Sequence, residues 1–357
     1  MTIKIKVLVV DDSAFMRKVI ADIINSDADL EVVGKAKNGN EALLKVKELK
    51  PDVITMDVEM PEMDGLSALG KIMAADPVPI IMLSSLTKSG AEQTFKALQL
   101  GAVDFIPKPS GQISLDIETI REEIVKKIKI AAGTKKKLQN FNSMPEIFAK
   151  KEVLPLKKAI DPNKELNKLV LIGTSTGGPK ALHQVIPRFP AYIDAGILVV
   201  QHMPPGFTKS LADRLDSLSE IRVKEAEQGE KVLPGCAYIA PGDFHLTVLQ
   251  STKDNVRELY INLNKSMPRG GLRPAVDVML ESVADQFWSH MVCVIMTGMG
   301  HDGAAALGRI KAKNAKIIAE HQSSCIVYGM PKAAVETGMV DKVVPLADIS
   351  EEVMRML

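Results

Sequence analysis

Residues 1–125 alternate between short apolar runs and longer amphipathic stretches. The apolar runs lie at 7–10, 53–56, 80–83 and 103–106. Stretches with helical periodicity lie at 14–24, 41–49 and 90–100. Strands that alternate with helices in this way predict an open parallel sheet with helices on both faces.

The same alternation resumes near residue 169. Apolar runs at 169–172, 196–200 and 292–296 predict three more strands. A hairpin is predicted where residues 237–240 run into the turn Pro241-Gly242-Asp243. This second region therefore also reads as an α/β domain with a parallel sheet.

Between the two regions, from about residue 121 to 167, lysine becomes dense and prolines punctuate the chain. A basic segment with several prolines is typical of an extended, solvated connector. We therefore expect a first domain at 1–125, an interdomain linker at 126–166 and a second domain at 167–357.

Composition excludes several classes of protein. The chain has 357 residues with 46% hydrophobic and 25% charged residues, which is typical of a soluble globular protein. The net charge of +1 gives no global field that would attract nucleic acid. No signal peptide and no apolar stretch long enough to span a bilayer is visible, so we expect no membrane insertion. Three cysteines without metal-type spacing fit a reducing compartment, and we expect a cytoplasmic protein.

Polar side chains follow the apolar runs of the first domain. Asp11 and Asp12 come directly after the first run, Asp57 after the second, Ser84 after the third and Lys108 soon after the fourth. Carboxyl ends of parallel strands meet at one edge of a sheet, where such folds bind ligands. Three carboxylates there predict a hard cation such as Mg²⁺, and the hydroxyl and ammonium groups suit a phosphoryl group. The alternative is that the two aspartates only cap the following helix, but capping explains one of them.

The second domain contains a candidate nucleophilic serine. Residues 173–177 fit G-x-S-x-G, which places Ser175 at a sharp turn between a strand and a helix. The alternative is a glycine loop that binds a phosphate or a nucleotide. The Walker pattern does not fit, because Pro179 rather than lysine follows Gly178.

His202 and Asp302 each come shortly after another predicted strand, so with Ser175 they should share one sheet edge. A serine hydroxyl needs an imidazole to take its proton, and the imidazole needs a carboxylate to orient it. Alternatives remain for each residue. His202 precedes a Pro-Pro turn, Asp302 has the place of a helix N-cap, and His301 competes for the role of base.

The first domain resembles the response-regulator receiver family. The matching residues are Asp11-Asp12, Asp57 within M-D-V-E-M-P-E-M-D-G, Ser84 and Lys108-Pro109. The resemblance implies a flavodoxin-like fold with a five-stranded parallel sheet and phosphorylation of Asp57 by a chemotaxis histidine kinase. It also implies a cis Lys108–Pro109 bond, a Mg²⁺ site and a set of switch residues. The implied metal site comprises Asp11, Asp12, Asp57 and the main-chain carbonyl of Glu59, and the implied switch residues are Ser84, Phe105 and Lys108.

Residues 169–357 resemble the catalytic domain of CheB-type protein-glutamate methylesterases. The resemblance lies in G-T-S-T-G-G at 173–178, Q-H-M-P-P-G-F at 201–207, Y-I-A-P-G-D at 238–243 and T-G-M-G-H-D-G at 297–303. It implies a Rossmann-like, mostly parallel sheet. It also implies Ser175 as nucleophile, His202 as base and Asp302 as orienting acid, with Thr176 and Met299 lining the site. His301 departs from the asparagine familiar in this pattern.

Together the resemblances imply a phosphorylation-activated hydrolase of chemotactic adaptation. It would remove methyl groups from glutamate methyl esters on chemoreceptors, release methanol, and deamidate receptor glutamines. Mg²⁺ is expected in the receiver, no cofactor is expected for the esterase reaction, and a monomer is the family default. The alternative is a receiver fused to a non-enzymatic, nucleotide-binding output domain.

Overall fold

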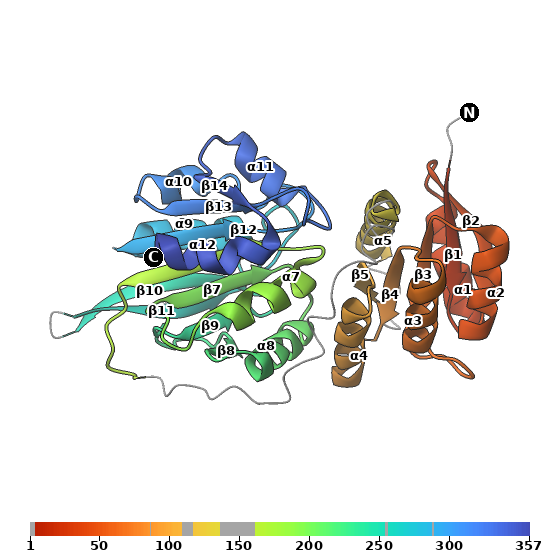
Figure 1. Cartoon of the computed structure of the whole chain (residues 1–357), viewed down its shortest axis with the longest axis horizontal. Helices are drawn as coiled ribbons and strands as arrows, with labels where there is room; N and C mark the ends of the chain where they lie inside the picture. The colour runs from red at the N-terminus through yellow and green to blue at the C-terminus, as the bar shows by residue number, and fades with distance from the viewer. Residues whose placement is uncertain (1–3, 86, 109–116, 136–160, 254–255, 288) are drawn as a thin grey trace. The chain divides into compact units, whose positions relative to one another are not determined.

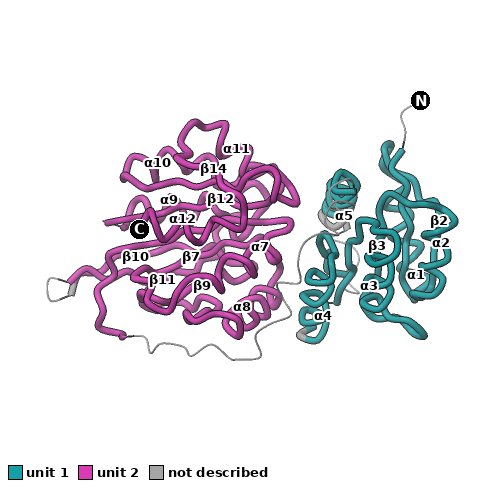
Figure 2. Tube along the Cα trace, in the orientation of Figure 1, with its two compact units in different colours: residues 1–149 teal, residues 150–357 magenta. Residues whose placement is uncertain are grey.

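The computed structural model describes residues 4–85, 87–108, 117–135, 161–253, 256–287 and 289–357. The chain divides into two compact units, residues 1–149 and 150–357 (Figure 2). Each unit contains a parallel sheet with its own helices (Figure 1). Among the described residues, no helix is both long enough and apolar enough to cross a membrane.

The first unit is a five-stranded parallel sheet in the order β2-β1-β3-β4-β5. Its strands are β1 (Ile5–Val10), β2 (Leu30–Ala36), β3 (Val53–Asp57), β4 (Ile80–Ser84) and β5 (Asp104–Pro107). Its helices are α1 (Ala14–Asn25), α2 (Gly39–Leu49), α3 (Gly65–Ala75), α4 (Lys88–Gln99) and α5 (Ile117–Gly133). This strand order is the flavodoxin-like one, so the predicted fold class is confirmed.

Burial explains which strands the apolar pattern revealed. Residues 7–10, 53–57 and 80–84 are buried throughout, because β1, β3 and β4 lie inside the sheet with helices on both faces. β2 lies at the edge, where most of its residues are only half-buried, and the apolar pattern did not single it out.

Helix α5 continues past residue 125, where the first domain was expected to end, and stops at Gly133. Ile124, Ile128 and Ala131 are buried and recur at helical spacing, so this face packs on the unit's core. At the other end of the predicted linker, Leu166 belongs to the core of the second unit. Residues 136–160 lie outside the described part of the chain.

The second unit is a seven-stranded sheet in the order β14-β13-β12-β6-β7-β9-β8, with parallel pairing throughout. Its strands are β6 (Lys168–Thr174), β7 (Gly196–Gln201), β8 (Arg222–Glu225), β9 (Cys236–Ile239), β12 (His290–Ile295), β13 (Lys316–Glu320) and β14 (Lys342–Val344). The α-helices are α7 (Gly178–Val185), α8 (Phe207–Leu218), α9 (Val276–Gln286), α10 (Leu307–Lys311), α11 (Met330–Glu336) and α12 (Ile349–Met356). Two short 3-10 helices are η2 (Ile186–Arg188) and η3 (Leu346–Asp348).

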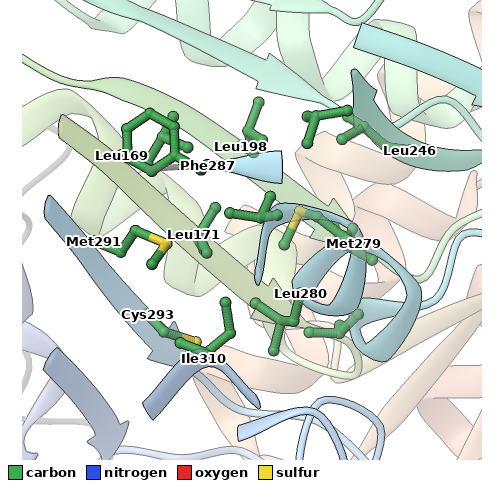
Figure 3. Packing of buried hydrophobic residues seen from close by; sticks show 14 of the residues in the cluster. Leu169, Leu171, Leu198, Leu246, Met279, Leu280, Phe287, Met291, Cys293 and Ile310 are labelled. Atoms are coloured by element: carbon green, nitrogen blue, oxygen red, sulfur yellow. The ribbon is translucent and has the colours of Figure 1, made fainter. Parts of the chain in front are cut away.

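The predicted hairpin is corrected by the structure. β9 is not a hairpin arm, because it pairs in parallel with β7 and β8 and is buried along its whole length. The hairpin follows it, as β10 (His245–Lys253) and β11 (Val256–Asn264), which form a separate antiparallel sheet. Its inward residues, with α9, cover one face of the main sheet (Figure 3).

The order of the second sheet decides where chemistry can occur. β6 lies between β7 and β12, so the loops that follow these three strands share one edge. The chain runs from β6 to β7 on one side and reaches β12 on the other side much later. Such a reversal opens a crevice at the carboxyl ends of the strands, and open α/β sheets bind their ligands there.

Candidate functional site

The first unit gathers three carboxylates at the ends of β1 and β3. Ligand oxygens of Asp11, Asp12 and Asp57 lie within 4.8 Å of one another. Asp11 and Asp57 are buried, whereas Asp12 is exposed. Closely spaced carboxylate oxygens are the ligands that a hard divalent cation prefers, so this donor set fits Mg²⁺. The exposed Glu59 follows on the same loop, and its N–H donates to Asp57 Oδ1 at 3.3 Å.

Helix capping does not account for these aspartates. Ser13 is the N-cap of α1, and its hydroxyl accepts a hydrogen bond from the Met16 N–H. Asp11 accepts from the Ser13 N–H through Oδ1, while its Oδ2 faces Lys108. The alternative in which Asp11 and Asp12 only cap the helix is therefore wrong.

Lys108 joins the pocket from the end of β5. Its Nζ lies 2.6 Å from Asp57 Oδ2 and 3.0 Å from Asp11 Oδ2. Burial raises the pKa of Asp57 to about 6, although Lys108 opposes the shift. The nearby Asp11 charge adds to the rise. The Lys108–Pro109 bond, predicted to be cis, lies outside the described residues because Pro109 does.

The predicted switch residues lie beside this pocket. Ser84 is fully buried, and its hydroxyl donates to the Gly90 carbonyl at 3.1 Å in the first turn of α4. Phe105 is also buried, with Lys127 Nζ of α5 5.3 Å from the centre of its ring. The structure thus places Ser84 and Lys108 at one sheet edge, and connects Phe105 to α5.

We expect Asp57→Asn to stabilise the first unit at pH 8 in EDTA by about 3 kcal/mol. The folded-state pKa of about 6 exceeds the ordinary 3.8, so protonated Asp57 contributes stability below pH 3.8. That contribution is lost as the pH rises through about 6, whereas an amide keeps it. The advantage should therefore vanish below about pH 4.

Calorimetry of the full chain from pH 4 to 8 would check this. We expect the first unit's transition to be the one that Mg²⁺ shifts in the wild type. An Asp57→Asn midpoint at or below that of the wild type at pH 8 in EDTA would contradict the prediction.

In the second unit, Ser175 follows β6 in a loop with tightly packed glycines. Its N–H donates to the Thr297 carbonyl at 3.0 Å, and its carbonyl accepts from the Gly178 N–H at 2.8 Å. A Cβ on Gly178 would lie 2.0 Å from Gln201 Oε1, and one on Gly298 would lie 2.9 Å from Ser175 Cβ. Gly177 has a φ of 79°, which favours glycine. These contacts hold the serine close to the loops after β7 and β12.

His202 and Asp302 form the ion-pair geometry expected of a base and its orienting acid. His202 Nε2 lies 2.8 Å from Asp302 Oδ2. The carboxylate accepts this hydrogen, so Nε2 carries it and Nδ1 is left to take a proton. Within the described residues, no hydrogen bond joins Ser175 Oγ to the His202 ring. Such contacts are often long before substrate binds, so this geometry does not argue against the pair.

Asp302 accepts further hydrogen bonds besides the one from His202. Its Oδ2 also accepts from the Val276 N–H at 2.6 Å, and its Oδ1 accepts from the Asp277 N–H at 3.0 Å, both at the start of α9. Burial acts against its charged form, but His202 and these N–H groups outweigh it. The pKa of Asp302 therefore lies below its ordinary value. The surroundings of Asp302 therefore favour its ionised form.

Asp277 completes this arrangement, and sequence reasoning missed it. Its Oδ1 accepts from the Ala306 N–H at 2.9 Å, so the loop after Asp302 is held by α9 while Asp302 holds α9. Burial raises the pKa of Asp277, and the charge of Asp302 adds to the rise. An aspartate in the first turn of a helix is common, so no local signal distinguished it.

The remaining candidates are two histidines and two residues expected to line the site. His301 is exposed, and Asp302 bonds His202 instead, which favours His202 over His301 as the base. His183 is buried in α7, where Nδ1 bonds the Pro179 carbonyl at 2.6 Å. Thr176 is buried in the serine loop, and its carbonyl accepts from Thr297 Oγ1 at 3.0 Å. Met299 is half-buried in the neighbouring loop.

The loop is a poor phosphate cradle. A phosphate-binding loop directs several successive N–H groups at its anion. Here the Ser175 and Gly178 N–H groups donate to carbonyls of the protein. This internal bonding counts against the nucleotide-binding alternative.

Comparison with known proteins finds similarity along the whole chain. The family described as CheB methylesterase matches residues 170–353, and the family described as response regulator receiver domain matches residues 7–119. The protein-glutamate methylesterase/protein-glutamine glutaminase 1 of Syntrophomonas wolfei is 68% identical over 353 residues, covering 99% of each chain. The protein-glutamate methylesterase/protein-glutamine glutaminase of Pyrococcus horikoshii is 51% identical, covering 99% of this chain and 93% of that one.

A solved structure agrees for the second unit. The CheB methylesterase catalytic domain of Thermotoga maritima is 47% identical, with a TM-score of 0.51. The match covers 54% of this chain and 99% of that domain.

Proposed function

Since this chain belongs to the CheB methylesterase family and carries a response regulator receiver domain, we propose that it hydrolyses glutamate methyl esters and deamidates glutamines on chemoreceptors. The observation that carries the proposal is the hydrogen bond between the half-buried His202 and the buried Asp302, on the strand loops that flank the Ser175 loop. A serine, a histidine base and an orienting carboxylate are the groups that acyl transfer by a serine nucleophile needs.

The reaction begins when His202 Nδ1 takes the hydroxyl proton of Ser175 and Oγ attacks the ester carbonyl carbon. The tetrahedral intermediate collapses, the bond to the methoxy oxygen breaks, and His202 returns its proton to that oxygen as methanol leaves. Water then attacks the acyl-enzyme with His202 again as base, which restores Ser175 and releases the glutamate. With a glutamine substrate the same steps release ammonia.

The developing oxyanion needs N–H donors. The N–H groups of Ser175, Gly178 and Gly298 already donate to backbone carbonyls. The N–H groups of Thr176 and Gly177 in the serine loop and of Met299 in the facing loop are therefore the donors that we assign to the oxyanion. Thr176 and Met299 would thus line the site through backbone as well as side chain.

The receiver gives the esterase its control. Asp57 would accept a phosphoryl group from a chemotaxis histidine kinase, and Lys108 Nζ, 2.6 Å from its carboxylate, would pair with the added charge. Mg²⁺, held by Asp11, Asp12, Asp57 and the Glu59 carbonyl, would supply charge neutralisation for that transfer. Ser84 and Phe105 would pass the change to α4 and α5, which they contact.

Asp57→Ala should retain basal methanol release but lose its rise with a small phosphodonor and Mg²⁺. Without the acceptor carboxylate, no phosphoryl group can bias the receiver surface. Methanol release is measured with and without phosphodonor, and Asp22→Ala, which removes an exposed aspartate of α1, is the matched control. If phosphodonor raised methanol release by Asp57→Ala as much as by the wild type, the gating proposal would be wrong.

The function itself is tested by methanol release from methyl-esterified chemoreceptor membranes. Release by the full chain, stimulated by phosphodonor, supports it. No release, combined with thermal stabilisation by a nucleotide, would favour the nucleotide-binding alternative.

A further inference from the structure

A single buried amide links the backbones of Ser175 and His202. Gln201 is the last residue of β7 and is 2% exposed. Its Nε2 donates to the Ser175 carbonyl at 3.0 Å and to the His202 carbonyl at 3.1 Å. A side-chain amide has two N–H hydrogens, so these two bonds use its full donor capacity.

These bonds lie just where the sheet stops holding the two loops together. The parallel register of β6 and β7 ends at the pair Thr174 and Gln201, and the His202 N–H still donates to the Thr174 carbonyl at 3.2 Å. Beyond that bond, the serine loop turns into α7 and the histidine loop turns toward Pro204. The Gln201 side chain therefore continues the connection between the strands by one more residue on each.

The far side of the amide explains its orientation. Gln201 Oε1 is buried and has no hydrogen-bond partner among the described residues. It lies against Gly178, where a Cβ would come within 2.0 Å of it. Reversing the amide would place Oε1 against two carbonyl oxygens, so the protein accepts one unsatisfied acceptor to keep both donors on the catalytic loops.

We propose that Gln201 is a positioning residue that sets the separation of the nucleophile Ser175 and the base His202. This inference rests on the proposed function, since it gives these two residues their roles. Gln201 does not touch the reacting atoms, because both its bonds go to main-chain carbonyls. Its contribution is therefore to serine activation rather than to receptor binding.

Two substitutions test this. Gln201→Met keeps the length without a donor, and Gln201→Glu keeps the shape but sets an acceptor against two carbonyls. Displacing catalytic groups by about 1 Å can cost about 100-fold in rate. We expect kcat for methanol release to fall about 10- to 100-fold in Gln201→Met, and further in Gln201→Glu, with KM little changed.

The matched control is Ser350→Ala. Ser350 is a buried donor to a backbone carbonyl, that of Val185 at 3.0 Å, and it holds the other end of α7. This variant should lose stability but retain kcat and KM. If Gln201 were only a structural residue, its variants would resemble this control once all are compared well below their unfolding temperatures.

The rate at which a fluorophosphonate labels Ser175 provides a second readout, because this reaction needs an activated serine but no receptor. We expect both Gln201 variants to label at least about 10-fold more slowly than wild type and Ser350→Ala. Labelling at the wild-type rate by folded Gln201→Met would overturn the inference. A wild type that labels but releases no methanol from receptors would contradict the proposed substrate instead, while the variant comparison would still decide the role of Gln201.

Discussion

Ser175→Ala should lower methanol release from methyl-esterified receptors by at least about 10⁴-fold. Alanine has no oxygen to attack the ester carbon, so the acyl-enzyme cannot form. The small loss of volume should leave the loop intact, because the bonds that hold Ser175 use its main chain. The hydrogen bond from its N–H to the Thr297 carbonyl remains, and so does the one that its carbonyl accepts from Gln201 Nε2.

The measurement is methanol release over a range of receptor concentrations, with Ser217→Ala as control. Ser217 is exposed in α8, and among the residues that the structure describes its hydroxyl bonds only the Arg214 carbonyl of the same helix, so its removal should not change the rate. A Ser175→Ala variant that releases methanol like the wild type would eliminate the serine mechanism. Loss of release with unchanged receptor binding would place the defect in chemistry.

Asp302→Asn should cost about 10⁴-fold in kcat, the second-largest effect we expect. One carboxylate here accepts three donors: the His202 ring and the N–H groups of Val276 and Asp277. An amide can offer only one oxygen, so its NH₂ group must face a donor. His202 would lose its orientation and the support for its charged form, and α9 would lose a cap bond.

Asp277→Asn separates these two roles. Asp277 lies in the same first turn of α9 and accepts backbone N–H groups of the loop after Asp302, those of Gly303 and Ala306, but within the described part of the chain it does not bond His202. Its raised pKa means that an uncharged amide should be tolerated at neutral pH. We expect at most a few-fold loss of kcat for this variant, and equal losses in the two variants would reduce Asp302 to a helix cap.

Much of the fold and of the site could be predicted from local sequence, because buried strands and the residues at their ends have recognisable local patterns. Strands inside a parallel sheet are apolar throughout, which predicted β1, β3, β4, β6 and β7. Chemistry in open α/β sheets follows the carboxyl ends of strands. The residues placed there, among them Asp57, Ser175 and His202, were therefore visible from spacing and motif.

The prediction was less good wherever the partner of a segment is far away in the chain. The hairpin was assigned to residues 237–240, although that segment is a buried parallel strand and the hairpin follows it. Its apolar residues and the turn after it were read correctly. Only pairing with β7 and β8 distinguishes a strand of the main sheet from a hairpin arm.

The sequence by itself determined two α/β units, an acidic edge in the first and a serine, a histidine and an aspartate in the second, because each is encoded within a few neighbouring residues. Only the tertiary structure decided that Asp302 bonds His202, that Asp277 holds the loop after Asp302, and that Gln201 joins the Ser175 and His202 loops. Those contacts depend on the strand order β7-β6-β12, which brings together loops that are distant in sequence. The order follows from how the strands pack over the whole domain, and no single segment specifies it.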